Sequence, residues 1–177
     1  MGGMISILFA GGYPQRVEKM ILNDIGPDVD PVGIARIGSY VGDSPTEFNN
    51  LQEVAAYYRA NYPAMANIPE PQLVEQVKWS VKPTDNGKLT WKMDPQIRRP
   101  TRTAARPLDL WVPCARIEAP VLVIRGADSD ILASRTVERM KSVVRGVESV
   151  EVPGVGHAPT LMEPESLAAI TKFLAIA

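Results

Sequence analysis

Apolar residues along this chain fall into short continuous runs and into runs with helical spacing. Continuous runs of about four to eight apolar positions that end at glycine or proline are typical of strands buried on both faces of a parallel sheet. Such runs predict strands at 17–25, 119–126 and 149–152. Runs of helical length or spacing predict helices over 3–10, 134–145 and 164–177. Helices and strands therefore alternate at both ends of the chain, which indicates an α/β fold.

The middle of the chain has a different pattern, with helical segments interrupted by prolines. Ser44-Pro45-Thr46-Glu47 matches a capping box and predicts that a helix begins there. Apolar residues then recur at helical spacing over 51–62 and 73–81, a turn at 85–87 leads into 89–93, and 100–107 is a basic, proline-containing connector. We predict a core segment at 1–27, a mostly helical cap at 28–112 and a second core segment at 113–177.

Composition narrows the class of protein. The 177 residues suffice for one domain with an insertion, and 45% hydrophobic with 22% charged residues is ordinary for a globular protein. A net charge of −1 gives no field that would attract nucleic acid or an anionic membrane, so we expect neither partner and a cytoplasmic protein. With Cys114 and His157 as the single cysteine and histidine, we expect no intrachain disulfide, no metal and no cofactor.

Polar residues that could do chemistry follow two of the predicted strands. The strand at 119–126 leads into Asp128-Ser129-Asp130, and the strand at 149–152 leads into a glycine-containing loop with His157. Functional groups of open α/β sheets gather beyond the carboxyl ends of the strands. A general base needs an imidazole held by a carboxylate, and these two loops can supply both. The alternative is that His157 caps a turn and the aspartates only begin a helix.

Several segments together resemble the α/β-hydrolase superfamily, of the serine esterase and carbon–carbon bond hydrolase kind. Met1-Gly2-Gly3 resembles the residues after the serine of the nucleophile elbow, G-x-S-x-G, so Met1 and Gly2 would be remnants of the elbow and its oxyanion hole. Residues 22–27 resemble the exit into the cap, 120–132 the strand-to-acid segment, and 154–159 the histidine loop. The resemblance implies a partial α/β-hydrolase sheet of about three parallel strands with flanking helices and an inserted, mainly helical cap.

The resemblance also implies site residues. The family's acid falls on Asp130 and its base on His157; Asp128 is the second choice for the acid, because the hydrophobic residue expected two places later is Leu132 for Asp130. The serine would stand immediately before Met1, and no serine of this sequence lies in G-x-S-x-G. The implied function is hydrolysis of a carboxylic ester, or of a related acyl or carbon–carbon bond, by a chain that lacks its nucleophile and is inactive alone.

Other functions stay open at this point. The chain could be a catalytically silent oligomeric protein on the same scaffold, or a small-molecule binding module. Aromatic residues of the middle segment could line an apolar site for a small hydrophobic ester-like substrate, although such residues are also typical of a cap core; they are Tyr58, Trp79, Trp91 and Trp111. The strand at 17–25 would expose an unpaired edge, which predicts a homo-oligomer.

Overall fold

A computed structural model describes residues 1–98 and 108–175. Its contacts divide the chain into two compact units, residues 1–34 with 106–177, called the sheet unit below, and residues 35–105, called the inserted unit. The predicted segment boundaries after residues 27 and 112 stay a prediction, and the predicted connector at 100–107 lies outside the described residues.

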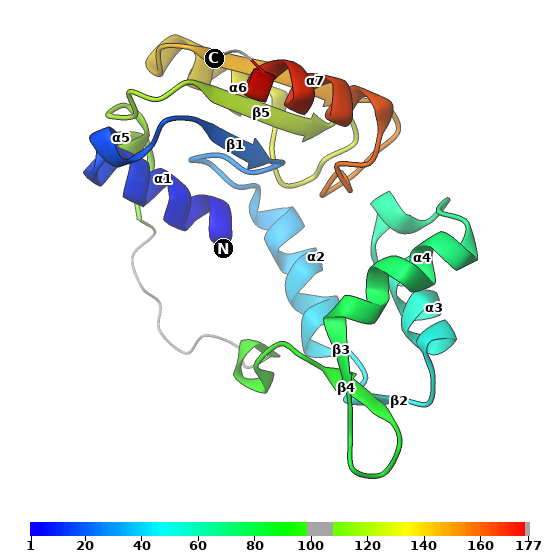
Figure 1. The fold of residues 1–177 in the computed structure, drawn as a ribbon. Coiled ribbons are helices and arrows are strands. Elements are labelled where there is room, and N and C mark those ends of the chain that lie inside the picture. The colour runs from blue at the N-terminus through cyan, green and yellow to red at the C-terminus, as the bar shows by residue number, and fades with distance from the viewer. Residues whose placement is uncertain (99–107, 176–177) are drawn as a thin grey trace. The chain divides into compact units, whose positions relative to one another are not determined.

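The sheet unit contains three parallel strands, as predicted. β1 (Met20–Asn23), β5 (Val121–Gly126) and β6 (Val147–Val152) pair in the order β1-β5-β6. Figure 1 shows β1 beside β5. Its helices are α1 (Gly2–Gly12), the short α5 (Trp111–Cys114), α6 (Ser134–Val143) and α7 (Pro164–Ala175). The alternation of helices and strands at both ends of the chain is thereby confirmed. β1 is shorter than the strand predicted at 17–25, because it begins at Met20 and ends at Asn23.

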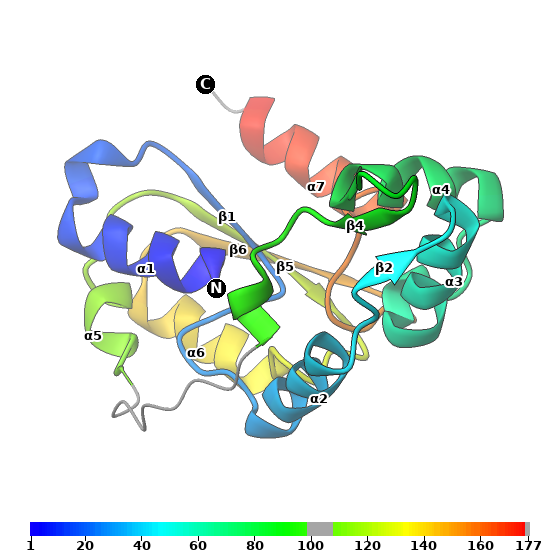
Figure 2. The same cartoon turned by 90° about the horizontal axis from the view of Figure 1, so that it is seen from below.

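Two apolar cores lie on opposite faces of this sheet. Val121 and Val123 of β5 pack in one core with residues of α1 and α6, and Leu122 and Ile124 pack in the other with Phe173 of α7. Figure 2 shows α1 and α6 on one side of the sheet and α7 on the other. Successive strand residues point to opposite faces, so a strand covered on both sides is apolar at every position. The two-sided burial explains the continuous apolar run of β5.

The inserted unit combines helices with a small sheet. Its helices are α3 (Leu51–Asn61), α4 (Glu70–Val77) and most of α2 (Pro31–Gly42), and β2 (Glu47–Phe48), β4 (Leu89–Trp91) and β3 (Val81–Pro83) form an antiparallel sheet in that order. The predicted helix start at Ser44 is wrong. Glu47 is in β2, and Asn50 caps α3 by accepting a hydrogen bond from the Glu53 backbone.

Single turns of 3₁₀ helix complete the described elements. They lie at Pro14–Arg16, Pro63–Met65, Lys78–Ser80 and Pro95–Arg98. Within residues 1–98 and 108–175, every helix is too short or too polar to span a lipid bilayer.

Candidate active site

The site centres on the single imidazole of the chain and a buried carboxylate. Nδ1 of His157, in the loop after β6, lies 2.7 Å from Oδ2 of Asp24, the residue that follows β1. The Asp24 side chain is fully buried, whereas the His157 side chain is 21% exposed. Because a carboxylate only accepts hydrogen bonds, the proton of this bond is on Nδ1. The lone pair of Nε2 can then accept a proton from another group.

The backbone turns sharply at Asp24, which directs its side chain across the end of the neighbouring strand. The Asp24 N–H donates to the Ile124 carbonyl at 2.7 Å, extending the pairing of β1 with β5 by one residue. Asp24 then has φ of 53°, the left-handed region that aspartate tolerates better than most residues. Strand pairing and turn together place the carboxylate at the carboxyl ends of β1 and β5.

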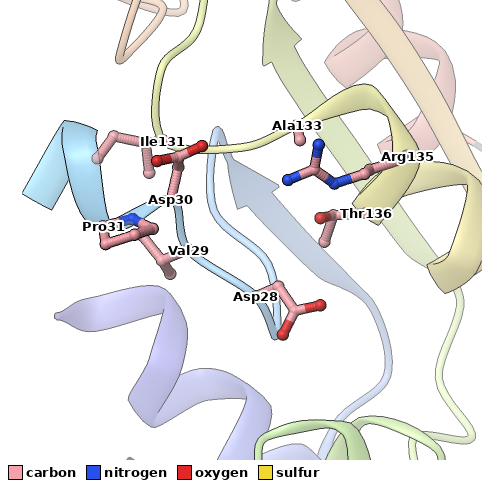
Figure 3. A pocket seen from close by; sticks show the side chains of 8 residues that line it. All are labelled: Asp28, Val29, Asp30, Pro31, Ile131, Ala133, Arg135 and Thr136. Carbon is pink, nitrogen blue, oxygen red and sulfur yellow. The ribbon is translucent and has the colours of Figure 1, made fainter.

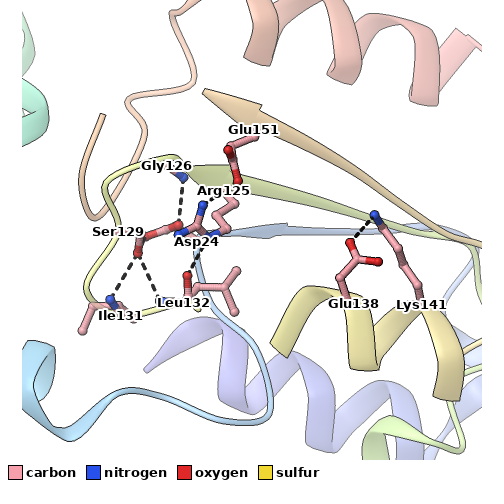
Figure 4. Close-up of polar contacts among 9 residues, drawn as sticks. All are labelled: Asp24, Arg125, Gly126, Ser129, Ile131, Leu132, Glu138, Lys141 and Glu151. Atoms are coloured by element: carbon pink, nitrogen blue, oxygen red, sulfur yellow. Dashed lines mark hydrogen bonds and ion pairs between the residues drawn. The ribbon is translucent and has the colours of Figure 1, made fainter. Parts of the chain in front are cut away.

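Two further donors satisfy the Asp24 carboxylate. The Gly126 N–H donates to Oδ1 at 2.9 Å, and the Ser129 hydroxyl donates to Oδ2 at 2.6 Å (Figure 4). A buried carboxylate is costly unless charge-assisted hydrogen bonds replace its hydration. Together with the imidazole, three groups donate hydrogen bonds to the Asp24 carboxylate.

The loop after β5 is held from both ends. Arg125 donates from Nε to the Leu132 carbonyl at 2.7 Å and pairs with Glu151 of β6 (Figure 4). Ser129 Oγ accepts hydrogen bonds from the backbone of Ile131 at 3.2 Å and of Leu132 at 3.1 Å. These bonds fix the segment that carries Ser129 and Asp130.

The histidine loop is held against the ends of β1 and β5. Asn23 donates from Nδ2 to the Pro159 carbonyl at 2.9 Å, and the Asp128 N–H donates to the Val155 carbonyl at 3.0 Å. The loop also passes so close to Gly126 that a Cβ there would lie 2.3 Å from the Val155 oxygen. Only glycine at 126 allows this approach without movement of the loop.

Glu163 closes the other end of the histidine loop, just before α7. Its carboxylate accepts hydrogen bonds from the backbone and hydroxyl of Thr160 and from the hydroxyl of Ser166. Partial burial raises the pKa of Glu163, but these hydrogen bonds outweigh it and hold the pKa below its ordinary value. Glu163 therefore anchors the segment that follows His157.

The structure gives the His157 Nδ1 contact to Asp24 rather than to Asp130, the predicted partner. Asp130 lies four residues beyond the end of β5, in a turn whose backbone packs against Gly33, and its side chain is half-buried. Asp128, the second choice, is exposed. Asp24 is closer because it is the first residue after its strand. A signal for it was present in the sequence, since Asn23 and Asp24 interrupt an apolar run directly before Gly26-Pro27.

The elbow remnants lie at the beginning of α1. Met1 is 84% exposed, and its carbonyl accepts the Ile5 N–H at 3.2 Å. A Cβ at Gly2 would meet nothing within 4 Å, whereas one at Gly3 would lie 2.2 Å from Ile25. Of these two glycines, the one at a close contact is therefore Gly3.

The four predicted aromatic site residues do not form one group. Trp91 and Tyr58 line the same cavity of about 200 Å³ in the inserted unit, together with Tyr57 and Tyr62. Burial raises the pKa of Tyr62, with smaller contributions from neighbouring tyrosines. Trp91 is also part of the core of this unit. Trp79 is 70% exposed, and the ammonium groups of Lys78 and Lys92 lie 5.3 and 5.6 Å from the centre of its ring.

Trp111, the fourth of these residues, lies in the sheet unit. It packs against the core on the α1 side of the sheet, and the Arg139 guanidinium stacks 3.8 Å from the centre of its ring. Trp111 thus belongs to the sheet unit, whereas the cavity lined by Trp91 and Tyr58 belongs to the inserted unit.

A second cavity, of about 230 Å³, belongs to the sheet unit. Figure 3 shows the Arg135 guanidinium and the Thr136 hydroxyl on one side and Asp30 with Pro31 on the other. Asp30 accepts the Val32 N–H at 2.9 Å. Polar and apolar residues both line this cavity, and it adjoins the loop of Ser129 through Ile131. Within the described residues, no three acidic, histidine or cysteine side chains converge as a metal site.

Comparisons with known proteins find hydrolases. The chain is 38% identical to a 3-hydroxybutyrate-oligomer hydrolase of Cupriavidus necator, over 98% of this chain and 62% of that protein. It is 25% identical to a 2-(acetamidomethylene)succinate hydrolase of Mesorhizobium japonicum, over 98% of this chain and 61% of that protein. No model of a known protein family matches the chain.

Solved structures give the same result for the fold. An α/β hydrolase from Novosphingobium aromaticivorans superimposes with a TM-score of 0.83 at 32% identity, covering 97% of this chain and 61% of that one. The chain thus spans about three fifths of the length of the relatives that it matches.

Proposed function

We propose that this chain, which has the fold and the relatives of the α/β-hydrolase superfamily, carries the acid–base part of a Ser-His-Asp hydrolase site. Asp24 is the orienting acid and His157 the general base. The observation that carries the proposal is the 2.7 Å contact between Nδ1 of His157 and the buried carboxylate of Asp24. A carboxylate in this position fixes the tautomer of the ring and stabilises the imidazolium formed during the reaction.

The proposed chemistry follows from the hydrogen bond between Nδ1 of His157 and Asp24, which leaves Nε2 to accept a proton. Nε2 of His157 takes the proton of a serine hydroxyl as its oxygen attacks the ester carbonyl, and then gives that proton to the departing alkoxide. A water molecule, deprotonated in the same way, releases the acid from the acyl-enzyme. Asp24 stays ionised throughout, and its hydrogen bonds from Gly126 and Ser129 support that charge.

We propose a carboxylic ester as the substrate, and an oligomer of a short hydroxy acid as the first one to test. The 38% identical relative acts, by its name, on 3-hydroxybutyrate oligomers. The other relative is named for hydrolysis of a different compound, so the shared element is hydrolysis rather than one substrate.

The nucleophile of the proposed site comes from polypeptide beyond these 177 residues. This part of the proposal is supported by the relatives, of which the chain spans about three fifths, and by Met1-Gly2-Gly3, which matches the elbow after its serine. The 177-residue chain alone is then expected to hydrolyse activated esters no faster than its His157→Ala variant.

The test is ester hydrolysis by the product of the complete reading frame, with 4-nitrophenyl butyrate and a 3-hydroxybutyrate dimer as substrates. We expect His157→Ala and Asp24→Asn to lower kcat/KM by about 10³-fold or more, because each removes a member of the triad. Asp130→Asn is the matched control and is expected to retain activity within about tenfold. A large loss in Asp130→Asn with an active Asp24→Asn would refute the assignment.

The cavity of the inserted unit supports a second candidate function, the binding of a small apolar ligand. Four aromatic side chains line it, and apolar ligands with a few polar contacts are the usual occupants of such cavities; the four are Tyr57, Tyr58, Tyr62 and Trp91. Quenching of tryptophan fluorescence by a ring-bearing carboxylic ester, lost in Trp91→Leu but kept in Trp79→Leu, would support this function.

A further inference from the structure

We infer that Ser129 is a positioning residue of the site, which fixes the Asp24 carboxylate so that Oδ2 faces the imidazole of His157. This inference rests on the proposed function and adds a residue to it. Ser129 lies in the loop after β5 and is neither in a serine elbow motif nor in hydrogen-bond contact with the histidine ring.

The hydrogen bonds around Ser129 leave its hydroxyl one orientation. A hydroxyl has one proton to donate and two lone pairs that accept. The N–H groups of Ile131 and Leu132 occupy the acceptor positions at 3.2 and 3.1 Å, and the oxygen lies 2.6 Å from Asp24 Oδ2. The proton of Ser129 is therefore directed to Asp24. The same commitment excludes Ser129 as a substitute nucleophile, because its proton is not shared with the imidazole.

The carboxylate needs this donor to hold its plane. Rotation about the last bond of an aspartate side chain is soft, so hydrogen bonds decide where each oxygen lies. The Gly126 N–H fixes Oδ1, and Ser129 fixes Oδ2, the oxygen that also receives His157 Nδ1. Without Ser129, the plane of Asp24 is held on the Oδ2 side by the imidazole alone.

The loop after β5 holds Ser129 rigidly in its contact with Asp24. Arg125 ties the Leu132 carbonyl to β5 at 2.7 Å, while the Leu132 N–H donates to Ser129. Leu132 is fully buried in the core on the α6 side of the sheet. The hydroxyl that holds Asp24 is thus fixed through Leu132 to the packed core.

The test uses the 177-residue chain, in which His157 is the only histidine, so an imidazole labelled with ¹⁵N gives one set of ring signals. Solvent exchange of the Nδ1 proton is measured at a pH at which the ring is neutral. We expect Ser129→Ala to accelerate this exchange about tenfold, because a charge-assisted hydrogen bond next to the measured one is lost. Ser129→Thr, which keeps the hydroxyl, and Ser142→Ala, an exposed serine on α6, should match the wild type.

The Asp24→Asn variant separates failure of this inference from failure of the proposed function. An amide at 24 can donate to Nδ1 and should move the ring proton to Nε2. If Asp24→Asn leaves the tautomer unchanged, the acid–base pair itself is wrong. If Asp24→Asn inverts the tautomer while a folded Ser129→Ala exchanges within twofold of the wild type, only the inference about Ser129 is overturned.

Thermal unfolding shows which variants are folded. If Ser129→Ala does not fold, Ser129→Cys replaces it, because cysteine has a side chain of similar shape with a weaker donor. Solvent exchange of the Nδ1 proton in Ser129→Cys is then expected to be at least threefold faster than in the wild type. Exchange of the folded cysteine variant within twofold of the wild type would overturn the inference.

Discussion

Gly126→Ala tests how closely the histidine loop is fitted to the end of β5. The substitution keeps the backbone N–H that donates to Asp24, so it adds only a methyl group. That methyl carbon would lie 2.3 Å from the Val155 oxygen and 2.7 Å from the Gly156 oxygen. Both contacts are with backbone, which cannot rotate away as the end of a side chain can. The loop itself has to move.

The size of the movement can be worked out from these distances. Ordinary van der Waals contact begins at 3.4 Å, so the loop must retreat by about 1 Å at Val155. His157 is two residues further along the same loop. If His157 moved by the same distance as Val155, its 2.7 Å hydrogen bond to Asp24 would lengthen beyond hydrogen-bond distance. Overpacking of this kind costs about 1–3 kcal/mol of unfolding free energy.

The assay combines denaturation by urea with the ring signals of His157. We expect a loss of unfolding free energy in that range and faster solvent exchange of the Nδ1 proton. Gly12→Ala is the control, because a Cβ at Gly12 would meet nothing within 4 Å among the described residues. A Gly126→Ala variant within about 0.5 kcal/mol of the wild type, with an unchanged Nδ1 signal, would refute the fitted-loop argument.

Three further predictions concern other parts of the molecule. Burial raises the pKa of the Cys114 thiol to about 11, so at pH 8 only about one thiol in a thousand is ionised, and reaction with a disulfide reagent should follow unfolding; rapid labelling of the native protein would contradict this. The pKa of Glu163 is lower in the folded chain, so its carboxylate stabilises the fold above about pH 4.5, and that stability is lost as the pH falls. Glu163→Gln should therefore lower the urea midpoint at pH 7 and have less effect below pH 4, and an equal effect at both would show that the charge is unimportant. The apolar side chains of α1, of which Phe9 is 48% exposed, and the edge strand β1 predict association of two copies, which light scattering at increasing concentration would detect and Phe9→Glu would weaken; a wild type that stays monomeric contradicts it.

The sheet could be predicted from the sequence because burial on both faces leaves a plain pattern. β5 is apolar at nearly every position, and its strand was found at the predicted place. The histidine loop could also be placed, since His157 follows the strand that became β6. These features depend on local composition and on the rule that functional groups lie at the carboxyl ends of strands.

The carboxylate that contacts His157 could not be identified by the same means. The apolar run predicts that Asp24 is part of a strand at 17–25, whereas in the structure Asp24 has a left-handed backbone, with φ of 53°, and its N–H pairs with the distant Ile124 carbonyl. Asp130 fitted the spacing of the family better. Which of two carboxylates meets an imidazole depends on a difference of a few residues in where each strand ends, and sequence patterns do not resolve strand ends that finely.

The inserted unit shows a competition between two helix caps. Ser44 and Glu47 matched a capping box, but Asn50 and Glu53 form the actual cap, with Asn50 accepting the Glu53 N–H and Glu53 accepting the Asn49 N–H. Glu47 is instead paired with Thr90 in a sheet. Both segments have residues that are typical of a helix N-cap. Glu47 pairs with a strand about 40 residues later in the sequence, and local patterns do not contain that pairing.

The position of Asp24 accounts for other residues around it. His157 follows β6, and Asp24 follows β1, with β5 between these two strands. To reach Asp24, the histidine loop must cross the end of β5, and it does so over Gly126, where it also accepts the Asp128 N–H. An acid in the loop of β5 itself would require no such crossing. The lack of a side chain at Gly126 and the direction of the Ser129 hydroxyl are therefore both explained by a carboxylate at the end of β1. Gly126 lets the histidine loop pass, and Ser129 holds the carboxylate that the imidazole contacts.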